Sequence, residues 1–323
     1  MRKKLILLSL ILLGAGAAAQ TQDAVINLSV AQLRAEPDYE SALETQSLMG
    51  TPVAIIDSTS YWRRIVTPDY TAWVNVLALA PMPEGYREAM KYICTAEYSH
   101  VYAEANAKSD RLSDLVAGDL LRMDGVLKIN MYGGGKKMTP KKKGTFCGVI
   151  LPDGRQGWVP ASDLAEFSDW AAAANPTAAA IIETARQYVG VPYLWGGNSP
   201  KGFDCSGLVQ HSFFLNGLLL PRNASQMVQL GQSVDVSHVL EGDFSTLQSG
   251  DLLFFGNKET GKVTHVGLYI GGDRFIHSSQ VVRINSLIST APDYYENSYR
   301  LLTARRVLGS SDVTPLTRSP YYF

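Results

Sequence analysis

The chain has 323 residues, and its 29 basic and 30 acidic side chains give a formal net charge of −1 at pH 7. A nucleic-acid-binding surface needs an excess of basic residues, so we expect no nucleic-acid partner. With 46% hydrophobic and 18% charged residues, the composition is that of an ordinary globular protein, and the length predicts two or three domains.

The first twenty residues, MRKKLILLSLILLGAGAAAQ, have the three parts of a secretory signal peptide: a basic start, a short apolar stretch and small residues before the cleavage site. The apolar stretch is too short to span a bilayer, no cysteine directly follows it, and no later segment reaches ~18 apolar residues. We therefore expect a protein exported to the periplasm or secreted, and neither a lipoprotein nor a transmembrane protein. The oligomeric state stays open.

The N-terminal half contains a sequence repeat at an offset of 68 residues, in which residues 33–53 align without gaps with residues 101–121. Each copy ends in a Trp-Val pair. Short alternating runs bounded by Gly, Pro, Asp and Ser predict two small all-β units, at 23–82 and 85–166. The pattern resembles bacterial SH3-like domains, which often accompany cell-wall enzymes.

The second copy is the longer one. Trp73 follows Gly50 by 23 residues, whereas Trp158 follows Gly118 by 40, a difference of 17. The stretch MYGGGKKMTPKKKG accounts for most of this difference, and we interpret it as an inserted loop. Its five lysines could form a docking patch for an anionic polymer, although a solvated loop is the simpler interpretation.

Three cysteines are too few for a disulfide scaffold. Cys94 and Cys147 fall in the same predicted unit and could pair, which would leave Cys205 as a free thiol. The sequence does not supply the geometry that a disulfide requires.

The C-terminal half, residues 174–310, reads as helices followed by strands, which is an α+β layout. It follows a predicted linker at 165–176 and precedes a tail at 311–323. Asn175 as N-cap and Pro176 as the first helical residue predict a helix over 177–189, and a second short helix is expected near 223–231. Four apolar runs predict strands at 250–256, 264–272, 274–279 and 300–308.

The segment GFDCSGLVQHSFF, residues 202–214, predicts a helix that carries a reactive thiol. Its apolar residues recur at helical spacing, and Asp204 is a candidate N-cap, which places Cys205 in the first turn. Unpaired amides and the helix dipole there favour a thiolate and could stabilise an oxyanion. Such a nucleophile also needs a base.

His265 and His277 lie in adjacent predicted strands. If these strands are antiparallel neighbours, both side chains can point to the sheet face that receives the Cys205 helix. The order Cys, His, polar residue is that of papain-like sites, with His265 as base and His277 as its orienting partner. An inert buried thiol and a zinc site are the alternatives, but closely spaced ligand pairs are absent, so no metal is expected. His211 is expected to be a surface or structural residue.

The motif DCSGLV after PYLWGG, with THVGLYIG and FIHSS downstream, resembles the NlpC/P60 family of cell-wall cysteine peptidases over roughly residues 175–308. With two SH3-like domains in front, the whole chain is similar to the γ-D-glutamyl-L-diamino acid endopeptidases of that family. The resemblance implies a papain-like α+β catalytic domain without a cofactor. Its substrates would be peptidoglycan peptides, L-Ala-γ-D-Glu-diamino acid, cut after D-Glu by way of an acyl-enzyme.

The resemblance also implies roles for residues next to the nucleophile. Asp204 and Ser206 would bind the region of the L-Ala amine and the D-Glu carboxylate. Tyr193 and Trp195 would form a wall of the site, with core packing as the alternative, and Tyr193 could also donate to the oxyanion.

Further substrate contacts are implied in the segment LPRNASQM. Arg222 would pair with a substrate carboxylate, which suits its fork of donors. The family often has Arg-Asp-Ser here, whereas this chain has Arg222, Asn223 and Ala224 with Ser225 one position late. Asn223 thus stands at the aspartate position of the family pattern, and the role of its serine carries over to Ser225 only with a shift of one position.

In this subgroup the first SH3-like domain closes one end of the site. Tyr70 matches its tyrosine and would touch the free L-Ala amine, which would restrict the enzyme to peptides with a free N-terminal L-Ala. A carboxylate from the same domain would bind that amine, and Glu36 is preferred over Glu44 as the candidate.

Two other functions remain possible on the sequence. One is a cell-wall-binding protein with an idle catalytic domain, which predicts loss of Cys205 or a histidine. The other is an acyltransferase with the same Cys-His chemistry, which would need a second, amine-binding site. The sequence also leaves open whether the diamino acid is diaminopimelate or lysine, and whether the protein remodels the wall or processes released fragments.

Overall fold

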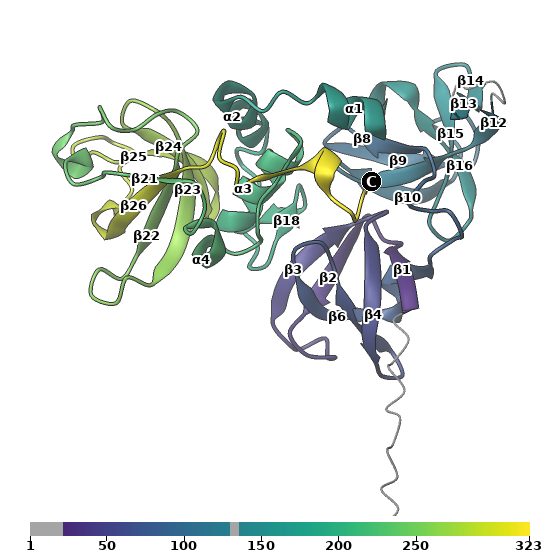
Figure 1. The fold of residues 1–323 in the computed structure, drawn as a ribbon, viewed down its shortest axis with the longest axis horizontal. Helices are drawn as coiled ribbons and strands as arrows, with labels where there is room; N and C mark the ends of the chain where they lie inside the picture. The colour runs from purple at the N-terminus through teal and green to yellow at the C-terminus, as the bar shows by residue number, and fades with distance from the viewer. Residues whose placement is uncertain (1–21, 130–135) are drawn as a thin grey trace, which may run out of the picture.

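The computed structural model describes residues 22–129 and 136–323, arranged as two β units and a larger α+β unit (Figure 1). The predicted signal peptide, residues 1–20, and part of the predicted inserted loop lie outside the described residues. Within the described part of the chain, none of the helices combines the length and hydrophobicity needed to cross a membrane.

The first unit is a seven-stranded antiparallel sheet in the order β3-β2-β6-β5-β4-β1-β7. Alternate residues such as Leu33, Ile65 and Val74 point inward and are fully buried, as the alternating sequence pattern requires. The strands are β1 (Gln22–Ile26), β2 (Val30–Arg34), β3 (Leu43–Leu48), β4 (Pro52–Ser58), β5 (Trp62–Val66), β6 (Thr71–Asn75) and β7 (Leu79–Pro81).

The second unit repeats this strand order, which confirms the repeat seen in the sequence. Its main sheet follows β10-β9-β16-β15-β11-β8-β17, so each strand has a counterpart in the first unit. The strands are β8 (Lys91–Cys94), β9 (Tyr98–Tyr102), β10 (Arg111–Val116), β11 (Leu120–Met123), β15 (Phe146–Ile150), β16 (Gln156–Pro160) and β17 (Leu164–Glu166).

The predicted insertion interrupts this second sheet between β11 and β15. It contains β12 (Gly125–Ile129) and β13 (Lys136–Pro140), which pair with each other, and β14 (Lys142–Lys143), which pairs with β15. The offset between matching strands rises across it, from 68 residues for β2 and β9 to 85 for β6 and β16, a step of 17. The insertion is therefore a hairpin and a short strand rather than an unstructured loop.

The pairing of Cys94 with Cys147 is wrong, because both are buried free thiols. Cys94 lies in β8 and Cys147 in β15, and β11 runs between these two strands. Strands two positions apart in a sheet are separated by about 9–10 Å, beyond the reach of a disulfide.

Most of the expected linker is a helix, α1 (Phe167–Ala173), which packs against β8 and β17 of the second β unit. The next helix, α2 (Ala178–Gln187), is capped by Thr177, whose hydroxyl accepts from the Ala180 amide at 3.2 Å. The predicted N-cap at Asn175 is therefore two residues too early. The short helix α4 (Ala224–Met227) begins after Asn223, as expected.

The sheet of this unit has six strands in the order β21-β26-β22-β23-β24-β25. Four of them match the predicted runs, whereas β21 and β25 were not predicted. The strands are β21 (Gln232–Val234), β22 (Leu252–Gly256), β23 (Val263–Gly271), β24 (Arg274–Ser279), β25 (Val281–Ser286) and β26 (Leu301–Arg306).

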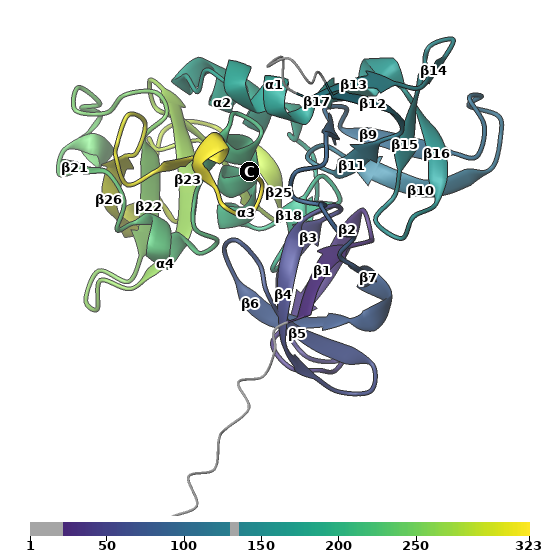
Figure 2. The same ribbon diagram turned by 45° about the vertical axis from the view of Figure 1, so that its right-hand side comes forward.

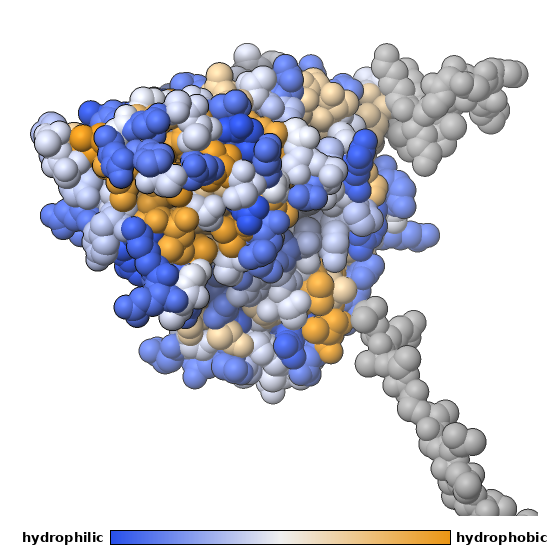
Figure 3. Space-filling view, turned by 60° about the vertical axis from the view of Figure 1, so that its left-hand side comes forward, coloured by the Kyte–Doolittle hydropathy of each residue, from blue (hydrophilic) through white to orange (hydrophobic). Residues whose placement is uncertain are grey.

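Helix α3 (Cys205–Phe214) is the central element of the molecule. Figures 1 and 2 show it between the six-stranded sheet and the two β units. Its Leu208 and Val209 pack with Val266, Leu268 and other residues of one sheet face, together with α2. The opposite face carries a second, aromatic cluster that includes Phe255, Phe275 and Tyr295. On the outer face of the third unit, hydrophobic side chains gather in a band bordered by hydrophilic ones (Figure 3).

The C-terminal tail is part of the fold. Strand β27 (Thr314–Pro315) pairs with β20 (Leu218–Leu219) of the third unit, and Leu316 in the following 3₁₀ turn is fully buried. Tyr322 packs against Phe167 of α1 and Phe214 of α3. The tail therefore connects elements that are far apart in the sequence.

Direct hydrogen bonds join the first β unit to the third unit. The side-chain oxygen of Gln46 in β3 accepts from the backbone N–H of Asn198 at 2.9 Å and from the Ser199 hydroxyl at 2.8 Å. Gln210 of α3 donates to Asp69 at 2.7 Å. Strand β3 and the loop before β6 are thus held against the helix that carries the cysteine.

Candidate active site

Cys205 is the first residue of α3, as predicted from the sequence. Asp204 has extended backbone angles, and its carboxylate accepts from the Gly207 amide at 2.7 Å, which makes it the N-cap. The loop before the helix is fixed by the same carboxylate, which also accepts from the Gly196 amide at 3.1 Å. The position of the thiol is therefore set by local hydrogen bonds.

The thiol is not acidified by its position, contrary to the sequence-based expectation. Burial raises the pKa of Cys205 to about 11, and the Asp204 carboxylate contributes in the same direction. Hydrogen bonds from the backbone N–H groups of Val266 and Ser206 lower the pKa but do not offset these effects. Cys205 is therefore a protonated thiol at neutral pH and needs a base to remove its proton.

The two predicted histidines are in contact, on β23 and β24. Nε2 of His265 lies 2.7 Å from Nδ1 of His277, and the rings pack edge to face. Burial, followed by His277 and two arginines, lowers the pKa of His265 to about 3. Burial lowers the pKa of His277 to about 4. Both imidazoles are neutral near pH 7, as a general base and its orienting partner must be.

The histidines lie on the sheet face opposite to the one predicted. His265 contacts Phe255 and Tyr295 of the aromatic cluster, whereas Val266, the next residue, packs against the α3 side. Because side chains alternate along a strand, the histidines cannot share the face that α3 covers. Cys205 reaches the strand through the backbone at Val266, next to His265.

Two residues that the sequence analysis missed complete this part of the site. Asn285 of β25 accepts from His277 at 2.9 Å. Tyr295 packs on the His277 ring with centroids 4.7 Å apart and on the His265 ring at 5.8 Å. Asn285 lies in a strand that was not predicted, and Tyr295 lies in a connection without regular structure, so neither carried a periodic signal.

Arg222 is a buried structural centre, with 1% of its surface exposed. Its Nη atoms donate to both Asp204 carboxylate oxygens, to the Ser206 hydroxyl and to the Gly197 carbonyl, and its Nε donates to Thr45 of β3. These five contacts account for the five N–H donors of a guanidinium. The predicted pairing of Arg222 with a substrate carboxylate is therefore wrong for this conformation.

Glu44, and not Glu36, is the carboxylate that contacts Tyr70. The Tyr70 hydroxyl donates to Glu44 at 2.5 Å, whereas Glu36 lies exposed in the loop after β2. Burial and then Glu44 raise the pKa of Tyr70, and a hydrogen bond with Asn223 acts against this. Glu44 and Tyr70 thus lie next to Asn223 of the third unit. The first β unit and the third unit therefore meet here, as the resemblance implies.

The remaining predicted residues are divided between the site and the surface. Tyr193 is half-buried, and burial, followed by Cys205 and Asp204, raises its pKa to about 12, so it is a neutral hydroxyl beside the nucleophile. Ser206 is buried with its hydroxyl on Asp204 and Arg222. Trp195 is 68% exposed, which excludes core packing, and Ser225 is exposed on α4.

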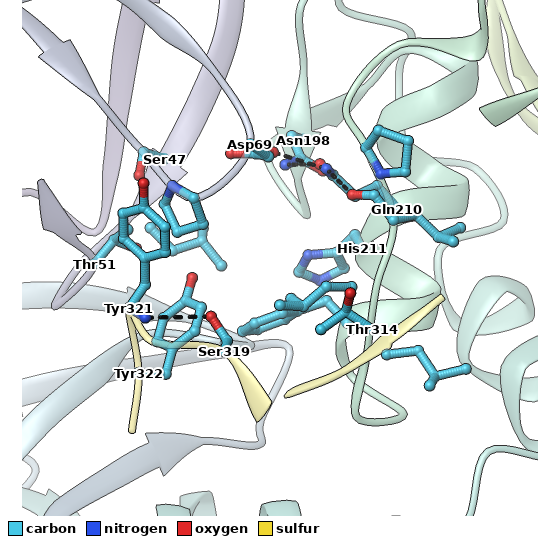
Figure 4. Close-up of a pocket in the computed structure, with 18 of the residues that line it drawn as sticks. Ser47, Thr51, Asp69, Asn198, Gln210, His211, Thr314, Ser319, Tyr321 and Tyr322 are labelled. Carbon is cyan, nitrogen blue, oxygen red and sulfur yellow. Dashed lines mark hydrogen bonds between the residues drawn. The ribbon is translucent and has the colours of Figure 1, made fainter. Parts of the chain in front are cut away.

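A separate cavity of about 500 Å³ lies where the two β units, the third unit and the tail meet (Figure 4). His211 and Gln210 of α3 line one side, and Ser47, Thr51 and the tail residue Tyr322 line the other. His211 is buried and hydrogen-bonded to Tyr188 at 3.1 Å, so its predicted structural role is confirmed. Cys205, His265 and His277 do not line this cavity, which therefore lies outside the candidate active site.

Comparisons with known proteins agree with this arrangement. The NlpC/P60 family model matches residues 190–301, and the model of the bacterial dipeptidyl-peptidase SH3 domain matches residues 33–79. The latter match covers the first β unit, so the SH3-like nature of the second unit rests on its strand order and stays a prediction.

Two curated relatives resemble most of the chain. Dipeptidyl-peptidase 6 of Lysinibacillus sphaericus is 28% identical over 87% of this chain and 98% of its own length. A γ-D-glutamyl-L-lysine dipeptidyl-peptidase of Bacillus subtilis is 28% identical over 80% of this chain and 79% of its own length.

A solved structure shows the same fold. It is an NlpC/P60 family protein from Bacillus cereus, which superposes with a TM-score of 0.71 at 22% identity and covers 88% of this chain and 99% of its own. With the matched domains and the cysteine–histidine site, the chain contains an NlpC/P60 cysteine peptidase domain with a bacterial dipeptidyl-peptidase SH3 domain in front of it.

Proposed function

We propose that this enzyme is exported and hydrolyses the γ-D-Glu–diamino acid bond of peptidoglycan stem peptides that have a free N-terminal L-Ala. Cys205 is the nucleophile, His265 the base and His277 its orienting partner. The observation that carries the proposal is the hydrogen-bonded His265–His277 pair, in which His265 lies on β23, the strand whose backbone contacts the Cys205 thiol at Val266.

The reaction follows from the protonation states of these groups. His265 removes the thiol proton as the sulfur attacks the γ-carbonyl, and Tyr193 is a neutral donor near the developing oxyanion. His265 then gives this proton to the leaving amine, which breaks the amide and leaves a thioester on Cys205. Water, deprotonated by His265, attacks the thioester and releases the acid and the thiol.

Recognition of the free amine falls to the first β unit. A carboxylate at Glu44, held by Tyr70, supplies the charge-assisted bond that an ammonium group requires. In intact wall the L-Ala is linked to glycan and has no free amine, so this preference favours released fragments. The Bacillus subtilis relative is named a γ-D-glutamyl-L-lysine dipeptidyl-peptidase, which supports the same type of scissile bond here.

The test uses purified protein with L-Ala-γ-D-Glu-diaminopimelate, the corresponding lysine peptide, and the N-acetylated form of each. We expect cleavage of at least one free peptide, no cleavage of the acetylated forms, and no activity in Cys205→Ala. Cys147→Ala, which changes a buried thiol of the second unit, is the control and should stay active. Cleavage by Cys205→Ala, or transfer of the acyl group to an added amine in place of hydrolysis, would reject the proposal.

Glu44→Gln tests the recognition of the amine separately. We expect kcat/KM for the free peptide to fall about 10- to 100-fold, since a charge-assisted hydrogen bond is lost, with the effect mainly in KM. Glu36→Gln removes an exposed carboxylate of the same unit and should leave kcat/KM unchanged. An equal effect of both substitutions would reject the role of Glu44.

A further inference from the structure

The amide of Asn285 has only one possible orientation in the structure. Asn285 is buried in β25 with 7% exposure, and its Nδ2 lies 2.6 Å from the backbone carbonyl of Asp293. A carbonyl oxygen can only accept, so the NH₂ group must face it and Oδ1 must face His277. The Ser286 amide donates to the same carbonyl at 3.1 Å, which fixes the carbonyl in place.

This orientation determines which nitrogen of each imidazole carries a proton. Oδ1 of Asn285 only accepts, so Nε2 of His277, at 2.9 Å, is protonated and Nδ1 of a neutral ring is not. That bare Nδ1 must accept from Nε2–H of His265, at 2.7 Å. Nδ1 of His265 is then unprotonated and is the nitrogen left for the thiol.

The hydrogen bond between the two histidines does not by itself determine which ring nitrogens carry the protons. The reverse pattern, with Nδ1–H of His277 donating to Nε2 of His265, has the same His–His hydrogen bond. In that pattern Nδ1 of His265 carries the proton and cannot accept one from Cys205. Asn285, which contacts the other nitrogen of His277, distinguishes the two patterns because its Oδ1 can only accept.

Sheet register places Asn285 there. His277 pairs directly with Arg283 across β24 and β25, and Asn285 is two residues further along β25. Side chains two residues apart in a strand share a face, so Asn285 is the diagonal neighbour of His277. The distance is within reach of a short amide side chain.

We propose that Asn285 is a positioning residue that sets the tautomers of both imidazoles, so that His265 presents an unprotonated Nδ1 to the thiol. This rests on the proposed peptidase function for its effect on activity, but not for its effect on the tautomers. Arg283 on β25 and Arg300 just before β26 act on the pair, and Tyr295 packs on both rings and is itself influenced by Cys205. All four are unchanged in the variants below.

The experiment combines long-range ¹H–¹⁵N NMR of the imidazoles with kinetics of the full chain, for Asn285→Ala and Asn285→Asp. In the wild type we expect both His265 and His277 as Nε2–H tautomers. Asn285→Ala should mix the tautomers and lower kcat/KM about 10- to 100-fold, the factor for a hydrogen bond to a group that becomes charged.

Asn285→Asp keeps an acceptor opposite His277 but loses the donor to the Asp293 carbonyl. It should therefore keep the wild-type tautomers and more activity than Asn285→Ala, with a lowered melting temperature. Its negative charge stabilises the imidazolium, so the acid limb of the kcat/KM profile should move to higher pH. Asn216→Ala is the matched control, because it also removes a partly buried asparagine with two hydrogen bonds, but in the α2–α3 contact. It should lower the melting temperature without a change in the tautomers.

Each outcome bears on a different statement. An Nδ1–H tautomer of His265 or His277 in the wild type overturns the proposal, whether or not the peptides are cleaved. Equal losses in Asn285→Ala and Asn285→Asp, with unchanged tautomers and lowered melting temperatures, would show a structural role only and also overturn it. Correct tautomers in a protein that cleaves no peptide would leave the role of Asn285 standing and reject the peptidase proposal.

Discussion

Cys205 illustrates how burial and helix position oppose each other at a single residue. The helix N-terminus and the amides of Ser206 and Val266 favour the thiolate, whereas burial and the neighbouring Asp204 favour the thiol. Burial dominates, so the pKa of the thiol is raised. In the proposed mechanism His265 must therefore remove the thiol proton as a general base.

This balance predicts how Cys205 reacts with iodoacetamide. Only the thiolate reacts, and a pKa raised to about 11 means that the thiolate fraction keeps rising with pH. We expect the alkylation rate to increase continuously from pH 6 to pH 10, measured by mass spectrometry with Cys205→Ala as the blank. A plateau between pH 5 and pH 8, typical of a thiolate–imidazolium pair, would contradict the expectation.

The histidines predict the acid side of the activity profile. The pKa of His265 is lowered, so the neutral base persists to lower pH than an exposed histidine would allow. The acid limb of kcat/KM should therefore have its midpoint below 6.5. A midpoint above that value in the wild type would show that the imidazole is stabilised as a cation.

At the scale of elements, the contact between α3 and the loop before it fixes the nucleophile. A Cβ at Gly207 would lie 2.0 Å from the Gly197 carbonyl oxygen and 3.1 Å from Asp204. The helix can approach this loop only because residue 207 has no side chain. Gly207 is thus required for the close packing of the first turn of α3 against the loop at Gly197.

Gly207→Ala should therefore displace the first turn of α3. We expect the free energy of unfolding to fall by about 1–3 kcal/mol, as at other overpacked sites. We expect kcat/KM to fall by a larger fraction of its wild-type value than the free energy of unfolding does. Urea unfolding and peptide hydrolysis measure the two effects. Ser225→Ala on the exposed face of α4 is the control, and equal behaviour of the two variants would reject the packing argument.

At the scale of the whole molecule, the site depends on contacts between units. Arg222 links Asp204 and Ser206 beside the nucleophile to Thr45 in β3, the residue next to Glu44. The first β unit and the residues beside Cys205 are thus parts of one hydrogen-bonded assembly. The tail reinforces it, since Tyr322 contacts Phe167, Phe214 and the Thr51 side chain.

Tyr322→Ala should loosen this assembly. Tyr322 is half-buried, so its removal should cost part of the about 3–5 kcal/mol lost for a fully buried ring, and we expect a clear fall in the melting temperature. The neighbouring Tyr321 is also half-buried, but the ring contacts with Phe167 and Phe214 belong to Tyr322, so Tyr321→Ala should have a smaller effect. Calorimetry compares the two, and equal melting temperatures would contradict a connecting role for the tail.

The sequence by itself determined the features that depend on local chemistry. Asp204 as N-cap, Cys205 at the start of a helix, the repeated β unit and four of the six strands in the catalytic sheet follow from spacing, capping and alternation, which act over a few residues. These signals are local, so they survive without knowledge of the fold.

Only the tertiary structure decided which distant groups meet. It put Glu44 rather than Glu36 against Tyr70, enclosed Arg222, placed the histidines on the other face of the sheet and brought Asn285 and Tyr295 against them. It also reversed the expected direction of the Cys205 pKa. The reason is that burial, sheet register and contacts between units are set by the whole chain, and no local pattern records them.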